Sequence, residues 1–449
     1  MSTGFIPPAA VSDEIPVRAQ SVPLVPQTLE DVGLPAEFIV DLILKALYVQ
    51  GARTGQQLTD LIRLPFPFID DQLLTLQQRQ LIEVLGTSGA SRAGYMFDLA
   101  GEGRGRAHEA LMGCQYVGPA PVPLEQYRRF TTTQSIQGVQ VTRPQVEQGF
   151  SWLVLKQAVL DEVGPAINSG RSLFLYGESG NGKTAIAETI ARMLGGSMFV
   201  PYAVEVDGQV IVTYDPLHHR PPHDDEPLPP DVGPLWLRDA AFDQRWTRTA
   251  RPVVLVGGEL TLDQLDLQYD EYTKLYQAPF QVKANGGVLI VDDFGRQRMP
   301  PRDMLNRWIV PLEKRVDFLT LHTGAKFPVP FDCLLVIATN IDPRQLVEEA
   351  FLRRIHYKIH VESPSVEQYE RIFLGCCKER DIPYDPAAIR QIYQSFYQAY
   401  GIAPRGCHPR DLLDHLVDIA KYLETRPVLT PDLIERAGGS YFLDFPTAP

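Results

Sequence analysis

Residues 173–194 read LFLYGESGNGKTAIAETIARML, and this stretch decides the fold. Its first four residues are an apolar run, which is typical of a strand buried on both faces. A glycine-rich turn follows, and residues 185–194 then have helical composition and spacing. The turn matches the pattern G-x-x-x-x-G-K-[ST], which cradles phosphates when a strand precedes it and a helix follows it. The stretch therefore predicts a phosphate-binding loop in a parallel α/β sheet.

The residues of this loop have separate expected roles. The glycines let backbone N–H groups turn towards the phosphates, and the new helix presents its positive end to them. Lys183 should neutralise charge on the β- and γ-phosphates, and the Thr184 hydroxyl should ligate Mg²⁺. The residues expected to contact the nucleotide are Gly177, Glu178, Ser179, Gly180, Asn181, Gly182, Lys183, Thr184 and Ala185.

Two further apolar runs end in polar residues. VLIV at 288–291 is followed by Asp292 and Asp293, and LLVIA at 334–338 is followed by Thr339 and Asn340. Ligands bind at the carboxyl ends of parallel strands, so these side chains should lie near the phosphates. We expect Asp292 to hold Mg²⁺, Asp293 to polarise the attacking water and Asn340 to orient it. The alternatives are a solvated turn residue for Asp293 and a mere strand end for Asn340.

The order of these motifs resembles the AAA+ superfamily. GESGNGKT is similar to its Walker A motif, VLIVDD to Walker B and VIATN to the sensor-1 strand. EEAFLRRI at 348–355 resembles the segment that carries the arginine finger, and CHPRDLL at 407–413 resembles the start of the sensor-2 helix. The resemblance covers about residues 146–440. The set DDFGRQR, NRWIVPLE and AFLRRI is also similar to a MoxR-like, chaperone-like bacterial group of AAA+ ATPases with a helical N-terminal domain.

This resemblance implies ATP and Mg²⁺ as ligands, ATP hydrolysis, and a homo-oligomeric ring, with a hexamer favoured. It also implies that Arg354, or secondarily Arg353, reaches the site of the next subunit, and that Arg410 contacts the γ-phosphate from the lid. Other interpretations stay open. The paired arginines can interact with a helix C-terminus or a carboxylate. Arg410 can form a salt bridge with Asp411 or Asp414.

The second Walker B position departs from the commonest AAA+ pattern. Many members carry Glu there, whereas this chain has Asp293, which is shorter by one methylene and shifts the carboxylate by about 1.5 Å. Replicative-initiator and helicase-loader AAA+ proteins resemble this chain in using two aspartates. We therefore expect hydrolysis, at a slow rate. The alternatives are a nucleotide-gated switch or scaffold with little turnover and, less favoured, a DNA-associated AAA+ ATPase.

The N-terminal part has the order of a small winged-helix-like α+β domain. Helical patterns at 35–48, 54–62 and 67–80 precede two strand patterns around a polar turn, and a helix at 102–111 closes the unit. Between residues 26 and 112, seven Lys and Arg face eleven Asp and Glu. This balance opposes DNA binding, which needs a basic face. A protein-docking role is favoured, and simple packing on the ATPase core is the alternative.

The domain organisation follows from these patterns. We expect an α/β P-loop NTPase domain with a parallel sheet and a C-terminal helical lid, preceded by the winged-helix-like domain. The expected ranges are a disordered tail (1–25), the winged-helix-like domain (26–112), a linker (113–145) that includes the proline-rich GPAPVPLE, the ATPase domain (146–362), the lid (363–441) and a short tail (442–449).

The composition limits the cellular location and the classes of partner that we expect. The formal net charge of −13 makes nucleic acid an unexpected partner. The five cysteines form no CxxC pair and suit a reducing cytoplasm. We expect no signal peptide and no integral membrane segment, because no apolar stretch is long enough. Four aromatics between the Walker strands, which can line a ring pore or simply pack in the core, are Trp236, Tyr269, Tyr272 and Tyr276. The expected function is ATP-driven remodelling of an unidentified protein client.

Overall fold

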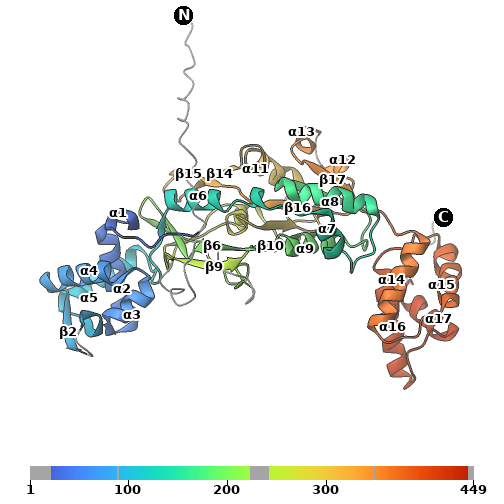
Figure 1. The fold of residues 1–449 in the computed structure, drawn as a ribbon, viewed down its shortest axis with the longest axis horizontal. Coiled ribbons are helices and arrows are strands. Elements are labelled where there is room, and N and C mark those ends of the chain that lie inside the picture. The colour runs from blue at the N-terminus through green and yellow to red at the C-terminus, as the bar shows by residue number, and fades with distance from the viewer. Residues whose placement is uncertain (1–21, 88–90, 223–241, 347–348, 443–449) are drawn as a thin grey trace, which may run out of the picture.

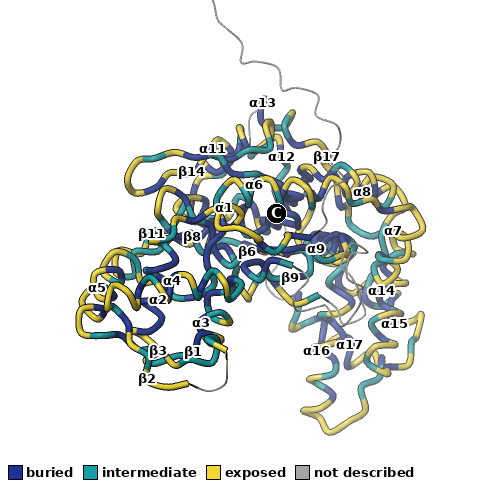
Figure 2. The backbone as a smooth tube through the Cα atoms, turned by 60° about the vertical axis from the view of Figure 1, so that its left-hand side comes forward, coloured by how far each residue is buried: buried dark blue, intermediate teal, exposed yellow. Residues whose placement is uncertain are grey.

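The computed structural model describes residues 22–87, 91–222, 242–346 and 349–442. Three parts follow one another along the long axis of the molecule in Figure 1. A helical N-terminal part is blue, the sheet-containing region is green to yellow, and a group of C-terminal helices is orange to red. Buried residues run through the centre of each part, while the outer turns of α5 and the end of β2 are exposed (Figure 2).

The N-terminal part has the predicted winged-helix-like arrangement. Thr54 caps α3 (Gly55–Ile62), because its hydroxyl accepts the N–H of Gln57 at 3.2 Å while the Gln57 side chain accepts the N–H of Thr54 at 2.9 Å. The strands form one antiparallel sheet in the order β1-β3-β2. The elements are α1 (Leu29–Val32), α2 (Ala36–Gln50), β1 (Arg53–Thr54), α3 (Gly55–Ile62), α4 (Phe66–Gln78), β2 (Ile82–Thr87), β3 (Tyr95–Leu99) and α5 (Gly101–Gly113).

A buried arginine joins this part to the sheet-containing region. Arg245 is 1% exposed and pairs with Asp243 at 2.7 Å. The same guanidinium donates to the Val32 carbonyl at 2.8 Å and to the Gln126 side chain at 3.2 Å. The expected tail also ends earlier than residue 25, because Val22 is 6% exposed and packs in an apolar cluster of this region. The N-terminal part is therefore packed onto its neighbour.

The range 113–145, for which we expected a linker, contains regular structure. The strand β4 (Val122–Pro123) pairs in parallel with β7 (Ala203–Val206), and α6 (Leu124–Thr133) begins directly after it. Tyr127 of α6 is 5% exposed. The prediction of a semi-rigid linker at 118–125 is wrong, because Pro123 suits both an edge strand and the residue before a helix, and long-range pairing with β7 selects that use.

A five-stranded parallel sheet forms the centre of the molecule, as predicted. Its strand order is β10-β13-β16-β5-β17, and every neighbouring pair is parallel. The strands are β5 (Ser172–Tyr176), β10 (Val253–Val256), β13 (Val288–Val291), β16 (Leu334–Thr339) and β17 (Tyr357–His360). The helices around it are α7 (Arg143–Gly149), α8 (Gln157–Ser169), α9 (Lys183–Met193), α10 (Phe280–Lys283), α11 (Pro301–Lys314), α12 (Pro343–Leu346) and α13 (Glu349–Leu352). The P-loop α/β fold class is confirmed.

Further strands, which the sequence patterns did not separate, extend this region. A mixed sheet has the order β11-β12-β8-β7-β4, and two antiparallel ribbons pair β6 with β9 and β14 with β15. The bounds are β6 (Ser197–Pro201), β8 (Gln209–Val212), β9 (Trp246–Ala250), β11 (Gln268–Asp270), β12 (Leu275–Gln277), β14 (Val316–Thr320) and β15 (Lys326–Pro330). Of the four aromatics, Tyr276 is 1% exposed in the core and Tyr272 is 82% exposed, while Trp236 lies outside the described residues.

The C-terminal part is helical, as predicted. It consists of α14 (Val366–Glu379), α15 (Pro386–Ile392), α16 (His408–Tyr422) and α17 (Pro431–Tyr441), with a π-helical turn at Tyr393–Gln398. Phe442, which we had placed in a tail, is 1% exposed and packs in the core of these helices. Throughout the described residues, no helix combines the length and apolarity that crossing a membrane requires.

Candidate nucleotide-binding site

The phosphate loop joins the central strand β5 to the helix α9. Gly177, Gly180 and Gly182 have φ of 140°, 83° and 88°, conformations that favour glycine. A Cβ added at Gly177 would lie 2.3 Å from the Val361 carbonyl oxygen, so no larger residue fits there. Gly182 is the N-terminal cap of α9, which places the positive end of that helix at the loop. The loop has the backbone shape that a phosphate group requires.

Lys183 lies inside this loop and is 6% exposed. Its ammonium group donates to the carbonyl oxygens of Gly177 and Glu178 at 2.8 and 2.9 Å. Burial lowers its pKa, and the nearby carboxylates of Asp292 and Asp293 oppose that shift. The cation is therefore held at the centre of the loop, where phosphate oxygens can replace the two carbonyl groups.

Four predicted site residues meet at the carboxyl edge of the sheet. The Thr184 hydroxyl donates to Asp292 Oδ2 at 2.7 Å, and the Asn340 amide donates to Asp293 Oδ1 at 3.1 Å. The strand order explains the second contact, because β16 lies between β13 and β5 and brings Asn340 beside the acidic pair. Asp293 has φ of 48°, an uncommon conformation for a residue other than glycine and one that occurs at functional sites.

The lid contacts the phosphate loop through its own backbone. The Cys407 N–H donates to the Gly180 carbonyl at 2.8 Å, and the Gly406 N–H donates to the Asn181 side chain at 3.2 Å. Asn181 also donates to the Ser363 hydroxyl at 3.2 Å, at the connection between sheet and lid. These contacts couple the position of the lid to the conformation of the loop.

Two lid arginines lie near this junction, and they have different ion-pair partners. Arg410 pairs with its neighbour Asp411 at 3.0 Å, which is the alternative we had stated, so its contact with the γ-phosphate stays a prediction. Arg405 instead pairs with Glu178 of the phosphate loop at 3.5 Å, and its charge contributes to the low pKa of Lys183. Sequence reasoning did not select Arg405. The sequence signal for Arg405 was its position in APRGC, directly before Gly406, whose N–H contacts the phosphate loop.

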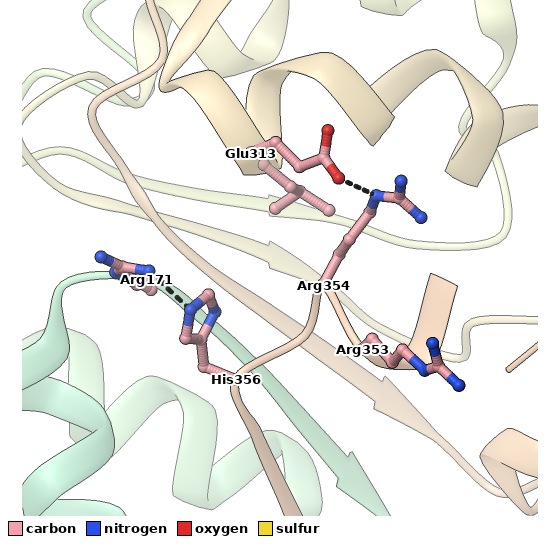
Figure 3. Close-up of a pocket in the computed structure, with 6 residues that line it drawn as sticks. Arg171, Glu313, Arg353, Arg354 and His356 are labelled. Carbon is pink, nitrogen blue, oxygen red and sulfur yellow. Dashed lines mark hydrogen bonds and ion pairs between the residues drawn. The ribbon is translucent and has the colours of Figure 1, made fainter. Parts of the chain in front are cut away.

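The two candidate finger residues lie at the opposite edge of the sheet. Arg353 and Arg354 follow α13 and precede β17, so they stand at the amino edge, while the phosphate loop is at the carboxyl edge. Arg354 pairs with Glu313 at 2.6 Å, and its carbonyl accepts the Ser172 hydroxyl at 3.1 Å (Figure 3). The five residues of β5 separate these edges by about 17 Å. One side chain does not cover that distance.

A small cavity of about 40 Å³ lies where the sheet region meets the lid. Most of its lining is apolar, and Asn181 and Gly406 connect it to the phosphate loop. The apolar lining residues include Leu155, Val159, Val361, Pro364 and Ile372. Lys156 and Glu362 form an ion pair at the same place. An apolar slot beside a phosphate loop suits the flat face of a nucleotide base.

The residues present fit a nucleotide with Mg²⁺. The positive-φ glycines shape the loop backbone, the buried Lys183 supplies a cation, and Thr184 with Asp292 supplies the hydroxyl and carboxylate oxygens that Mg²⁺ prefers. Among the described residues, no group of three or more His, Cys, Asp or Glu could hold a metal ion by itself. A Mg²⁺ ion at this site would therefore also need phosphate or water ligands.

Comparisons with known proteins give a family model for the C-terminal helices and distant structural neighbours. Residues 365–440 match a domain of unknown function, DUF8689. No curated protein matches the sequence. Among solved structures, NtrX from Brucella abortus in complex with ATP matches at 15% identity and a TM-score of 0.39, over 63% of this chain and 56% of that one.

A second neighbour is the Thermotoga maritima RuvB Holliday junction branch migration motor, at 14% identity and a TM-score of 0.35 over 63% of this chain and 68% of that one. A MarR family regulator from Neisseria meningitidis matches 16% of this chain at 22% identity and a TM-score of 0.15. The strand order and the phosphate loop of this chain themselves establish its fold. The comparisons add only a distant likeness to these solved structures.

Proposed function

We propose that this chain is a Mg²⁺-dependent AAA+ ATPase that works as a homo-oligomer and remodels another protein. One observation carries the proposal: the hydrogen bond of 2.7 Å between the Thr184 hydroxyl and the Asp292 carboxylate. It places the hydroxyl of the phosphate loop beside the acidic strand end, the two ligands that hold a phosphate-bound Mg²⁺ in P-loop NTPases. Asp293 directly follows Asp292, and Asn340, at the end of the neighbouring strand β16, contacts it where the attacking water would lie.

The roles of the chain's own residues follow from these contacts. Bound Mg²⁺ would neutralise the charge that develops on the phosphates. Lys183 exchanges its two carbonyl partners for phosphate oxygens, because a charge-assisted bond to phosphate is stronger than a bond to a neutral carbonyl. Asn340 holds the Asp293 carboxylate in one orientation, so that carboxylate can accept a hydrogen bond from the attacking water.

The base lies in the apolar cavity between sheet and lid. A volume of about 40 Å³ holds little more than one water molecule, so the lid shifts to admit a base. The Cys407 N–H donates to the Gly180 carbonyl, and the Gly406 N–H donates to the Asn181 side chain. A shift of the lid therefore moves the phosphate loop. Nucleotide binding is thereby coupled to lid position.

The separation of Arg354 from the phosphate loop supports an oligomer. The guanidinium stands at the amino edge of the sheet, about 17 Å from the phosphate loop at the carboxyl edge. It can therefore act on a phosphate only if that phosphate belongs to a second copy of the chain. A ring meets this condition at every interface, and we propose a hexamer from the resemblance to AAA+ proteins.

A protein is a better client than DNA for the N-terminal part. The basic residue of the turn between β2 and β3, Arg92, pairs with Asp70 of α4 at 2.7 Å. The exposed residues of α4, which would enter a DNA groove, include Asp71 and Leu74. An acidic and apolar helix surface repels phosphate backbones and suits contact with protein.

A nucleotide-gated switch is the second candidate, and Asp293 favours it. Asn340 donates a hydrogen bond to the short Asp293 carboxylate, and the Asp293 backbone has a left-handed conformation. If that geometry leaves the carboxylate short of the attacking water, ATP binds and turnover stays at background.

The test is Mg²⁺-dependent ATP hydrolysis over a range of protein concentrations, with ATP affinity measured in parallel. Wild type should gain specific activity as concentration rises. Lys183→Ala should lose ATP binding, whereas Arg354→Ala should bind ATP normally and lose turnover by about 10³-fold or more. The matched control is Arg436→Ala, which removes an exposed arginine of the lid from a surface ion pair and should behave as wild type.

The outcomes separate the two candidates. Tight ATP binding with background turnover at every concentration supports the switch and contradicts the motor. Failure of wild type to bind ATP contradicts both. Turnover that does not depend on protein concentration or on Arg354 contradicts the oligomeric mechanism.

A further inference from the structure

A second, strongly basic pocket lies at the amino edge of the central sheet, away from the phosphate loop. Its volume is about 440 Å³, which is in the usual range for ligand sites. The polar lining consists of three arginines, one glutamate and one histidine, drawn in Figure 3, and the residues are Arg171, Glu313, Arg353, Arg354 and His356. Three guanidinium groups and one carboxylate line the pocket, and this lining favours an anion.

Arg171 comes from a different segment than the two arginines that the sequence motif singled out. It directly precedes β5, and its guanidinium lies 2.6 Å from Nε2 of His356. Arginine has no lone pair to accept with, so Nε2 must accept and the imidazole proton is on Nδ1. Burial and the Arg171 charge lower the pKa of His356, which keeps the ring neutral near pH 7.

The charge of Arg171 is therefore held in place without being neutralised. In the described part of the chain its hydrogen-bond partner is the neutral imidazole, and no carboxylate pairs with it. Arg354 differs, since Glu313 neutralises much of its charge at 2.6 Å. A cation fixed by a neutral partner keeps its attraction for an incoming anion.

The two positions are built on neighbouring strands. The Ser172 hydroxyl, one residue after Arg171, donates to the Arg354 carbonyl at 3.1 Å, and a backbone hydrogen bond links His356 to Arg354. The buried Ile355 anchors the same segment. Figure 3 shows Arg353 pointing away from the Arg171–His356 pair. Arg171 and Arg354 consequently face one pocket in a defined relative position.

We propose that Arg171 is a second phosphate-contacting residue: together with Arg354 it receives the terminal phosphates of ATP bound to a second copy of the chain, and His356 is its positioning residue. This inference rests on the proposed oligomeric ATPase. The phosphates carry the negative charge that the pocket lacks, and the planar guanidinium groups of two arginines match phosphate oxygens pairwise.

The test combines single variants with subunit mixing of the full chain. At dilutions where the chain is unassembled, Arg171→Ala should bind ATP as tightly as wild type, because the residue is far from its own phosphate loop. In the assembled protein it should lower kcat by on the order of 10². Arg171→Lys should recover part of the loss, since it keeps the charge without the planar fork. Arg436→Ala is again the control for removing an exposed arginine.

Mixing shows on which copy Arg171 acts. Arg171→Ala supplies an intact phosphate loop, and Lys183→Ala supplies an intact Arg171. Under the proposal Lys183→Ala alone is inactive and Arg171→Ala alone turns over on the order of 10² more slowly than wild type, and the mixture should regain activity at interfaces that combine the two intact halves. No recovery on mixing, or weaker ATP binding by the unassembled Arg171→Ala chain, would place the residue in its own subunit and overturn the inference.

A last measurement separates direct contact from an effect through Arg354. Assembly driven by a non-hydrolysable ATP analogue, followed by sedimentation, should weaken in Arg171→Ala, in Arg354→Ala, and further in the double variant. If the double variant equals Arg354→Ala in assembly, Arg171 only positions Arg354 and the proposal is wrong.

If Arg171→Ala hydrolyses ATP within twofold of wild type, the inference fails while the proposed ATPase stands. If wild type and Arg436→Ala show no turnover at any concentration, the proposed ATPase itself fails.

Discussion

Acidification should loosen the lid through one buried histidine. His408, the first residue of α16, is 2% exposed, and its Nδ1 accepts the Arg405 N–H at 3.3 Å and lies 2.9 Å from the Tyr397 hydroxyl. Burial, with the Arg405 charge as a smaller cause, lowers the pKa of His408 from 6.5 to about 4. A ring protonated on both nitrogens could no longer accept the Arg405 N–H. The folded lid therefore prefers neutral His408.

The direction and size of the effect follow from linkage. Because the folded pKa lies below the unfolded one, the stabilisation is complete above pH 6.5 and is lost as the pH falls from there to about 4. The loss amounts to about 2 kcal/mol at pH 5 and about 3 kcal/mol at pH 4. The next residue towards the N-terminus, Cys407, donates to the phosphate loop, so ATP affinity should fall in the same window.

Hydrogen–deuterium exchange of lid peptides, corrected for the intrinsic effect of pH, measures this loss directly. The matched variant is His408→Gln, which keeps an acceptor and does not titrate in this range. It should cost roughly 1 kcal/mol at pH 7.5 and flatten the pH dependence of peptides from 407–422. His219, whose pKa burial also lowers to about 4, serves as an internal control, because peptides around it should stay acid-sensitive in the variant. Equal lid protection at pH 7.5 and 5 in wild type, or an unchanged slope in His408→Gln, would refute the reasoning.

Three further outcomes are expected. Arg245→Met should destabilise the protein by about 3–5 kcal/mol in chemical denaturation, because it leaves the buried Asp243 carboxylate without its partner. The double variant Arg245→Met with Asp243→Leu should lose much less stability. Equal losses of stability in the two variants would contradict a charge effect. Asn340→Ala should keep ATP affinity and lower kcat roughly 10- to 100-fold, because Asp293 loses its fixed orientation; a matching loss of affinity would contradict this role. Labelled duplex DNA should show no salt-dependent binding by anisotropy, because Asp70 neutralises Arg92, and binding that weakens steadily with salt would overturn the protein-client proposal.

The local motifs could be read from the sequence because their geometry is set by neighbouring residues. The phosphate loop needs glycines at three positions and a helix start immediately afterwards, all within eight residues. The strand that directly precedes Asp292 is apolar on both faces, and this pattern predicts a buried strand. The cap at Thr54 is equally local, since the capping residue and its partner are three positions apart.

Contacts between distant segments could not be read in this way. Pro123 is compatible with a linker, an edge strand or the residue before a helix, and only its pairing with β7 decides among these. The lid offers Arg405 and Arg410 five residues apart, and the turn that precedes α16 decides which one faces Glu178. The sequence carries no sign of the pair formed by Arg171 and His356.

The sequence by itself determined that this chain is a P-loop α/β protein with a helical lid and a winged-helix-like N-terminal part, because periodicity and loop chemistry act over a few residues. The tertiary structure alone decided how these parts meet: the buried Arg245 that ties the N-terminal part down, the lid backbone on the phosphate loop, and a basic pocket at the far edge of the sheet. Those features bring together residues far apart in the chain, such as Asn181 and Gly406, which are 225 positions apart. Side-chain spacing along the chain does not encode such distances.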